Sequence, residues 1–235
     1  MNAGLTWGLG IVLVLAVLIA LYVYVIRPWH MSWGATAEEV ARPLPDDGMV
    51  PHPKARATHG VTLPAPAAEV WPWLAQIGQG RGGFYSYDWL ENLFGCDIHN
   101  VDRIVPEFQD LKKGDGIKLH PKAPALSVVT LDPPHALVIC GGKDLQPDQP
   151  DDPSFLQLHR LRAYTWAFVL EDQPDGTSRF LARVHADWAP GLVNFFRYRL
   201  FLEPAHSIMQ RKMNLGLRAC VASSKTTSGS SAPGA

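Results

Sequence analysis

The feature that most restricts what this chain can form is an uninterrupted apolar run near its start. Residues 5–26 carry no charged side chain and are almost wholly apolar. As an α-helix rising about 1.5 Å per residue, the run is about 33 Å long, enough to cross the hydrocarbon core of a bilayer. Trp7 at one end and Tyr22, Tyr24 and Trp29 at the other are residue types that favour membrane interfaces. We therefore expect a transmembrane helix.

A cleaved signal peptide is the main alternative for this run. No Lys or Arg precedes it, and it is longer than an ordinary signal-peptide core, so the sequence favours an uncleaved single-span anchor over residues 1–27. Arg27 and Arg42 follow the span, which by the positive-inside rule places the rest of the chain in the cytoplasm. Three widely spaced cysteines form no disulfide framework and agree with a reducing compartment.

The remainder of the chain divides into three segments. Residues 28–54 contain several Pro, Gly and Asp residues and little periodicity, which is typical of a linker, with a short helix near 35–41. Residues 55–222 carry the periodic patterns of one folded domain. Residues 223–235 are composed mostly of Ser, Thr, Gly and Ala, which predicts a disordered tail. The net charge of -1 offers no basic surface, so we expect no nucleic-acid partner.

Within the domain, the spacing of apolar residues changes from strand-like to helical and back. The first patterns predict a strand at 56–63 and helices at 66–78 and 85–94. The patterns that follow predict strands at 117–120, 126–131, 136–140, 162–171 and 177–188, and then a helix at 191–221 that Pro204 kinks or divides. This order predicts an α+β fold, in which a curved antiparallel sheet surrounds a long C-terminal helix and leaves space between them.

Four segments give this domain a family resemblance. They are EVWPWLAQIGQGRGGFYSYDWLENLFG (69–95), DRIVPEFQDLKKGD (102–115), LDPPHALV (131–138) and HSIMQRKMNLG (206–216). Together they resemble the SRPBCC superfamily, the START/Bet v 1-like helix-grip proteins that include polyketide cyclase/dehydrase-like and lipid-transfer members. The resemblance covers about residues 56–222 and implies a helix-grip fold with an internal hydrophobic cavity. It implies no particular reaction, because one fold can host many functions.

The candidate ligand-binding residues are aromatic or titratable side chains of the domain: Tyr85, Tyr87, Trp89, Trp166, Arg183 and His185. The first three suit the mouth of a pocket, where amphipathic rings are useful, and they equally suit ordinary helix packing. Arg183, His185 and Asp187 alternate with apolar residues of one strand. Either this charged row faces the cavity and orients a polar group, or it lies in solvent on the convex face.

Two further motifs invite a cofactor or a metal. The glycine-rich segment 78–83 lacks the Lys-Ser/Thr ending of a phosphate-binding loop. Cys96 and His99, flanked by Asp97 and Asp102, match half of a zinc site, but no second ligand pair follows. We therefore expect no cofactor and no metal. His99 with Asp102 also suits acid–base chemistry, but no nucleophile motif is present and no catalytic residue is assigned.

These observations support one leading hypothesis on function and two alternatives. The leading hypothesis is membrane-anchored binding or transport of a hydrophobic small molecule, such as a lipid, an isoprenoid or a polyketide-like compound, in an internal cavity. The first alternative is a cyclase/dehydratase-like enzyme that acts on an apolar substrate through Arg183, His185 or His99. The second alternative is a protein-interaction module whose cavity is filled by side chains. The sequence predicts no oligomeric state.

Overall fold

The computed structural model describes residues 3–148 and 161–229. Its N-terminal part consists of α1 (Ala3–Leu21), η1 (Tyr22–Ile26), α2 (Arg27–Met31), α3 (Ala37–Ala41) and η2 (Asp47–Met49). The domain begins with β1 (Ala55–Leu63), α4 (Ala67–Ala75), α5 (Asp88–Leu93), η3 (Pro106–Phe108), β2 (Gly116–Ile117), β3 (Leu126–Asp132) and β4 (Ala136–Gly141). It ends with β5 (Leu161–Asp172), β6 (Ser178–Trp188), α6 (Leu192–Phe196), η5 (Arg197–Leu202) and α7 (Glu203–Gly229).

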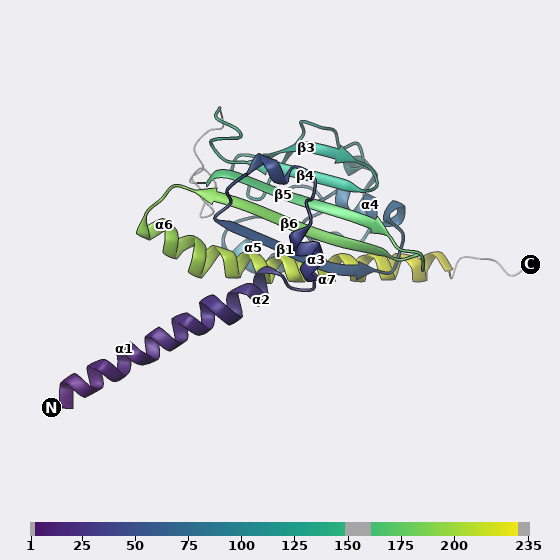
Figure 1. The fold of residues 1–235 in the computed structure, drawn as a ribbon. Helices are drawn as coiled ribbons and strands as arrows, with labels where there is room; N and C mark the ends of the chain where they lie inside the picture. The colour runs from purple at the N-terminus through teal and green to yellow at the C-terminus, as the bar shows by residue number, and fades with distance from the viewer. Residues whose placement is uncertain (1–2, 149–160, 230–235) are drawn as a thin grey trace, which may run out of the picture.

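The six strands form one sheet in the order β1-β6-β5-β4-β3-β2, and every neighbouring pair is antiparallel. The sheet curves over the long α7, and α4 and α7 pack together on the same side (Figure 1). This is the α+β arrangement that the sequence pattern predicts, with the curved antiparallel sheet around a C-terminal helix. It also agrees with the helix-grip architecture that the resemblance implies.

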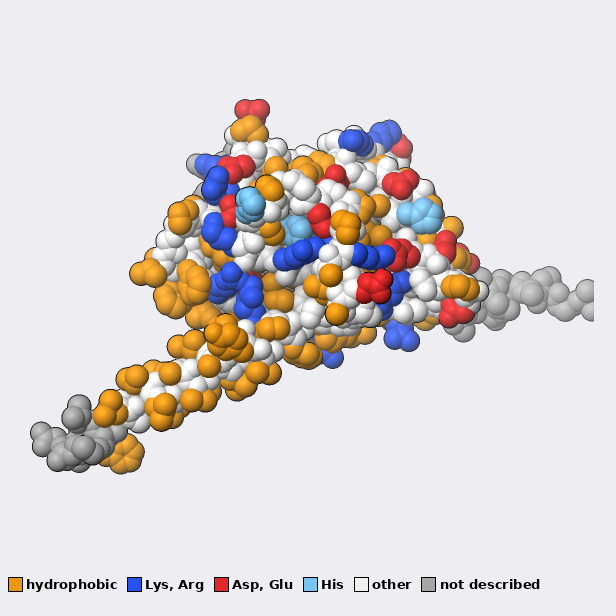
Figure 2. Space-filling view, in the orientation of Figure 1, with side chains coloured by type: hydrophobic (Ala, Val, Ile, Leu, Met, Phe, Trp, Pro, Cys, Tyr) orange, Lys and Arg blue, Asp and Glu red, His pale blue; other side chains and the backbone are white. Residues whose placement is uncertain are grey.

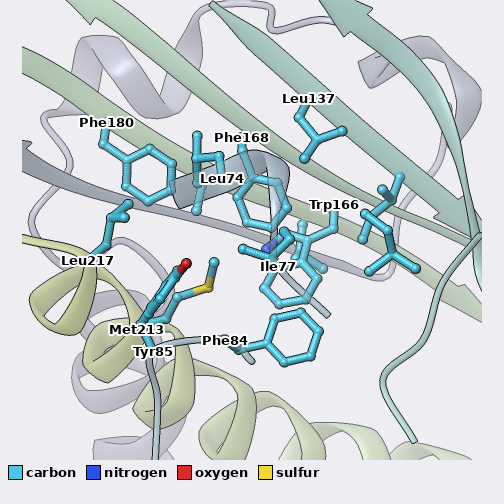
Figure 3. Packing of buried hydrophobic residues seen from close by; sticks show 14 of the residues in the cluster. Leu74, Ile77, Phe84, Tyr85, Leu137, Trp166, Phe168, Phe180, Met213 and Leu217 are labelled. Carbon is cyan, nitrogen blue, oxygen red and sulfur yellow. The ribbon is translucent and has the colours of Figure 1, made fainter. Parts of the chain in front are cut away.

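Large apolar side chains fill one half of the space between sheet and helix. Because successive residues of a strand point to opposite faces, the aromatic residues of β5 and β6 at alternate positions share the inner face. Phe168 and Phe180 stack there with ring centroids 6.2 Å apart. Figure 3 shows both rings directed toward Met213 and Leu217 of α7, with Leu74 of α4 beside them. All of these side chains are buried, so this half of the domain is its core.

The C-terminal helical run is continuous from Leu192 and includes one π-helical segment, η5, directly before Pro204. Proline lacks the N–H that an α-helix would use at this position, and a wider turn is one way in which a helix accommodates that loss. The helix extends to Gly229, so residues 223–229 are helical where the composition predicts a disordered tail. The last part of that predicted tail, 230–235, lies outside the described residues.

The N-terminal helix projects away from the domain (Figure 1), and its surface is covered with apolar side chains (Figure 2). Within the described residues, the segment Trp7–Met31 is long and apolar enough to cross a membrane. Its last turn contacts the domain, because α2 packs against α7 and β1. The N-terminal helical segment and the domain are therefore in direct contact.

The segment after α2 differs from the flexible linker that its composition suggests. Residues 36–50, which we call the strap, lie along the outer face of the sheet. The strap begins with a capping box between Thr36 and Glu39, and the Glu39 carboxylate accepts a 2.7 Å hydrogen bond from Arg179 of β6. Leu44 packs on Val169 and Leu181 of the sheet. Side-chain interactions and an apolar contact thus hold the strap to the sheet. The sequence of the strap has little periodicity, so the pattern alone did not predict this packing.

Candidate ligand-binding cavity

The second half of the space between sheet and helix is hollow. Four of the inward strand positions there carry small side chains: Ala55 and Ala57 of β1 face Ala186 and Val184 of β6 in register. These four positions carry no aromatic ring like those of Phe168 and Phe180, which fill the other half. The result is a cavity of about 280 Å³. Three alanines and one valine therefore leave room for it on β1 and β6.

The helical wall of the cavity comes from α7, η5 and α5. Met209, Gln210 and Met213 line it from α7, and Leu90 and Phe94 line it from α5. Two stacked aromatic pairs also line it: Phe84 stacks on Trp166 with centroids 5.7 Å apart, and Trp188 stacks on Tyr198 at 4.4 Å. The lining is almost entirely carbon, which suits an apolar ligand.

Two of the titratable side chains in the lining, His206 and Glu91, have a buried polar atom without a hydrogen bond among the described residues. His206 enters from α7 and Glu91 from α5. The Nε2 atom of His206 and the Oε2 atom of Glu91 are both buried, and neither makes a hydrogen bond among the described residues. A buried polar atom without a partner is costly, so such atoms mark places where a ligand group or a water can bind.

Burial shifts the pKa of each group toward its neutral form. The pKa of Glu91 rises to about 7 because of burial, with a further contribution from the nearby Asp88. The pKa of His206 falls to about 3, again because of burial, and the neighbouring His59 lowers it further. At neutral pH, His206 is an uncharged imidazole and Glu91 titrates. The site can therefore exchange hydrogen bonds, and at Glu91 a proton, with a bound molecule.

A hydrogen-bonded row on α7 fixes the surroundings of His206. The indole Nε1 of Trp166 donates to Gln210 Oε1 at 2.9 Å, and Gln210 Nε2 donates to Asn214 Oδ1 at 2.7 Å. The ring of His206 lies edge-on to Trp166, with centroids 5.6 Å apart. The indole of Trp166 is thus hydrogen-bonded to Gln210, and His206 Nε2 has no hydrogen-bond partner among the described residues.

Of the six residues proposed from the sequence, Trp166 lines the cavity. Tyr85 is buried outside it: its hydroxyl donates to the carbonyl of Trp73 at 2.8 Å and accepts from Gln76. Tyr87 and Trp89 form an edge-to-face pair, with Trp89 66% exposed, and neither lines the cavity. The structure therefore places these three aromatic side chains in packing or at the surface.

Arg183 and His185 lie on the outer face of the sheet, opposite the cavity. Arg183 is only 1% exposed, and its guanidinium donates to Thr58 Oγ1 at 2.9 Å, to Asp47 Oδ2 at 2.6 Å and to main-chain carbonyls of the strap. His185 Nδ1 lies 3.7 Å from Asp47 Oδ1. Arg183 and His185 thus follow neither sequence alternative, because they are on the convex face but buried beneath the strap. Asp187 of the same row, in contrast, is half-buried and pairs with Lys54.

The remaining sequence motifs have structural roles or lie apart. Segment 78–83 forms a closed turn in which the Gly78 and Gly83 main chains pair, and Arg81 donates to the carbonyls of Ala75 and Phe108. Cys96 is buried in the cavity wall, whereas His99 is exposed and pairs with Asp97. Within the described part of the chain, no three His, Cys, Asp or Glu side chains gather as metal ligands would.

Sequence reasoning did not select His206 or Glu91. His206 belongs to a stripe of α7 in which Glu203, Gln210 and Asn214 recur at helical spacing beside Met213 and Leu217. A polar row next to an apolar stripe on a helix expected to be buried is the signal that could have identified it. Glu91 had no comparable signal, since a lone Glu in a short helix is ordinarily a surface residue.

Comparisons with known proteins give no family assignment for this chain. No family model matches this sequence, and no curated protein matches it. Similar solved structures include protein NE0264 from Nitrosomonas europaea, which is 14% identical over 73% of this chain and 96% of that chain, with a TM-score of 0.43. Ara h 8.0201 is 14% identical over 72% and 97%, with a TM-score of 0.40. CalU16 from Micromonospora echinospora is 15% identical over 71% and 86%, with a TM-score of 0.32. Such values support no inference about function.

Proposed function

We propose that this protein binds or carries an apolar small molecule, such as a lipid, an isoprenoid or a polyketide-like compound, at the membrane in which its N-terminal helix is anchored. The observation that carries the proposal is the cavity of about 280 Å³ with its nearly continuous carbon lining. A hollow lined in this way favours an apolar occupant, because burying apolar surface is worth about 25 cal/mol per Å². Membership of the SRPBCC superfamily is part of the same proposal, supported by the resemblance and the element order.

The size and lining of the cavity narrow the class of ligand. Pockets for drug-sized ligands span roughly 300–1,000 Å³, so this cavity is at the small end of that range. Its two unsatisfied polar atoms, on His206 and Glu91, favour a molecule with one polar group, such as a hydroxyl or a carbonyl. A ligand of one polar group and a compact apolar body meets both conditions.

Native mass spectrometry tests the proposal. The full-length chain is purified in nanodiscs made from its own membrane extract and then released in the instrument. Full length is required because Met31 lines the cavity and the carbonyl of His30 accepts a 2.8 Å hydrogen bond from His59 Nε2. We expect a bound apolar molecule. A ligand-free mass, unchanged after incubation with the lipid extract, would contradict the proposal.

A second candidate function is the enzyme of the cyclase/dehydratase kind. It is favoured by Glu91, whose raised pKa near 7 places it in the range of a general acid or base, together with the free imidazole nitrogen of His206 in the same cavity. The residues that the sequence offered for catalysis, Arg183, His185 and His99, lie outside the cavity. If the protein is an enzyme, Glu91→Gln should retain the co-purified molecule but no longer convert it. If the protein is a carrier, neither the unmodified chain nor the variant should convert the molecule.

The interaction-module hypothesis makes a different prediction about the space under the sheet. It requires a filled cavity, whereas only the half around Phe168 and Phe180 is filled. The hollow half therefore supports ligand binding over this alternative.

A further inference from the structure

One end of the domain exposes large apolar side chains that a protein surrounded by water would normally bury. On α6 and η5 these are Leu192, Val193, Phe195, Phe196, Leu200 and Phe201. Beside the cavity, α5 and the residue after it add Trp89, Leu93 and Phe94. We call these nine residues the apolar face. Contiguous patches of this kind mark interaction sites on soluble proteins.

The apolar face borders the mouth of the cavity. Phe94, at the end of α5, and Phe201 of η5 both line the cavity, and they are 39% and 45% exposed. Each ring therefore has one side toward the cavity and another toward the outside. The cavity accordingly meets the surface between α5 and η5, within the apolar face.

The membrane-spanning segment is fixed beside this same end of the domain. The hydroxyl of Tyr22 donates to the carbonyl of Arg199 in η5 at 2.5 Å, and Arg27 Nε donates to Glu203 Oε2 at 2.8 Å. His30 Nδ1 lies 2.9 Å from Ser207 Oγ. Figure 1 shows that α1 and α6 both extend from this junction toward the same end of the molecule. The position of the domain relative to the span is thus set by specific contacts.

The charges on the α6 and η5 part of the apolar face match a bilayer surface, whereas α5 carries the acidic residues Asp88 and Glu91. Residues 192–202 contain Arg197 and Arg199 and no acidic residue. The nearby carboxylate of Glu203 is neutralised by Arg27 and by Arg199, which is 2.8 Å from its Oε1. Figure 2 shows Lys and Arg side chains between the apolar surface of α1 and that of α6. Helices that lie in a membrane interface combine Phe and Leu on one face with Arg on the other.

We propose that the apolar face is a second membrane-contact surface, which lies against the bilayer that α1 spans, and that the cavity opens there directly into the lipid. The inference rests on the proposed function for the anchor and the ligand class. It adds the route: an apolar molecule passes from the bilayer between Phe94 and Phe201 into the cavity without crossing water. A ligand longer than the cavity keeps its tail in the bilayer.

Fluorescence quenching of the full-length chain in vesicles tests this proposal. The vesicles contain equal parts of phosphatidylcholine and phosphatidylglycerol, and bimane is attached to a single introduced cysteine in Leu192→Cys or Leu200→Cys. Leu215→Cys is the matched control, since Leu215 is an exposed leucine about 22 Å beyond Leu200 on the same helical run. Leu13→Cys, in α1, reports insertion of the span. Labelling of the unmodified chain gives the background from its three cysteines, of which two are buried.

We expect brominated phosphatidylcholine to quench the labels at 192 and 200 several-fold more than the label at 215, and iodide in the water to show the reverse order. The proposal is overturned if iodide quenches 192, 200 and 215 alike while lipid quenches 13, and in that case the anchor stands. Failure of lipid to quench 13 would overturn the anchor as well. Protection of 192 and 200 from both quenchers, with crosslinks between copies, would replace the bilayer by a second copy of the chain.

Discussion

Replacing Ala186 with leucine should reduce the space in the cavity without harming the fold. Ala186 is an inward residue of β6 in the hollow half of the domain, so its added carbons enter empty space. The three added carbons take the space of about three ligand methylenes. Each buried CH₂ contributes about 0.8 kcal/mol, so binding weakens by about 2.4 kcal/mol, which raises the Kd about 60-fold. Native mass spectrometry should show the bound molecule lost or greatly reduced.

A matched control exists on the same strand and the same face. Ala182 faces Phe168 in the register of β5 and β6, in the filled half, and is buried. Leucine there has no space, and overpacking of this kind costs about 1–3 kcal/mol. At about 2–4 °C for each kcal/mol in a domain of this size, the melting temperature should fall for Ala182→Leu and stay level or rise for Ala186→Leu. Equal losses of stability, with ligand retained in Ala186→Leu, would refute the division into a filled and a hollow half.

Three further substitutions test other parts of the account. Arg183→Met should lower the free energy of unfolding by about 3 kcal/mol, since it removes the guanidinium donor from the Asp47 carboxylate and from several strap carbonyls, and limited proteolysis should then cleave the strap; an uncleaved strap would show that the guanidinium does not hold it. Gly216→Ala should destabilise by about 1–3 kcal/mol in urea unfolding, because its methyl would overlap the Tyr85 carbonyl oxygen, whereas Gly48→Ala meets no atom and should be neutral. For Glu91, the folded pKa near 7 exceeds the unfolded value of 4.5, so the native state binds the extra proton and stability falls as pH rises from 4.5 to 7. Glu91→Gln should flatten that part of the stability curve, and an unchanged slope would argue against a buried Glu91.

The sheet and the long helix were predictable because their residues carry a strong pattern. Alternation of aromatic with small residues in β5 and β6 allows one face to be buried, and it assigns Trp166, Phe168 and Phe180 to the same side. The apolar run of α1 is equally direct, since its length and lack of charge leave few other structures. Helix and strand existence therefore followed from local periodicity.

The site was much less predictable, because it depends on packing between distant segments. The outward position of Arg183 could be guessed from alternation, but its burial requires the strap, whose sequence has no periodicity. Tyr85 is of a residue type that suits the mouth of a pocket. Its hydroxyl is instead hydrogen-bonded to Gln76 and to the carbonyl of Trp73. The cavity lies beside small residues such as Ala57 and Ala186. The sequence does not show which side chains pack against an alanine in a strand, so it does not predict an empty space there.

The most direct test of the central claim is the mass of the full-length protein released from nanodiscs of its own membrane. The account predicts an added mass that corresponds to an apolar molecule with one polar group, present in the unmodified chain and diminished in Ala186→Leu. The account would be contradicted by a folded chain that carries no such molecule even after incubation with the lipid extract. It would also be contradicted if the bound molecule persisted unchanged in Ala186→Leu.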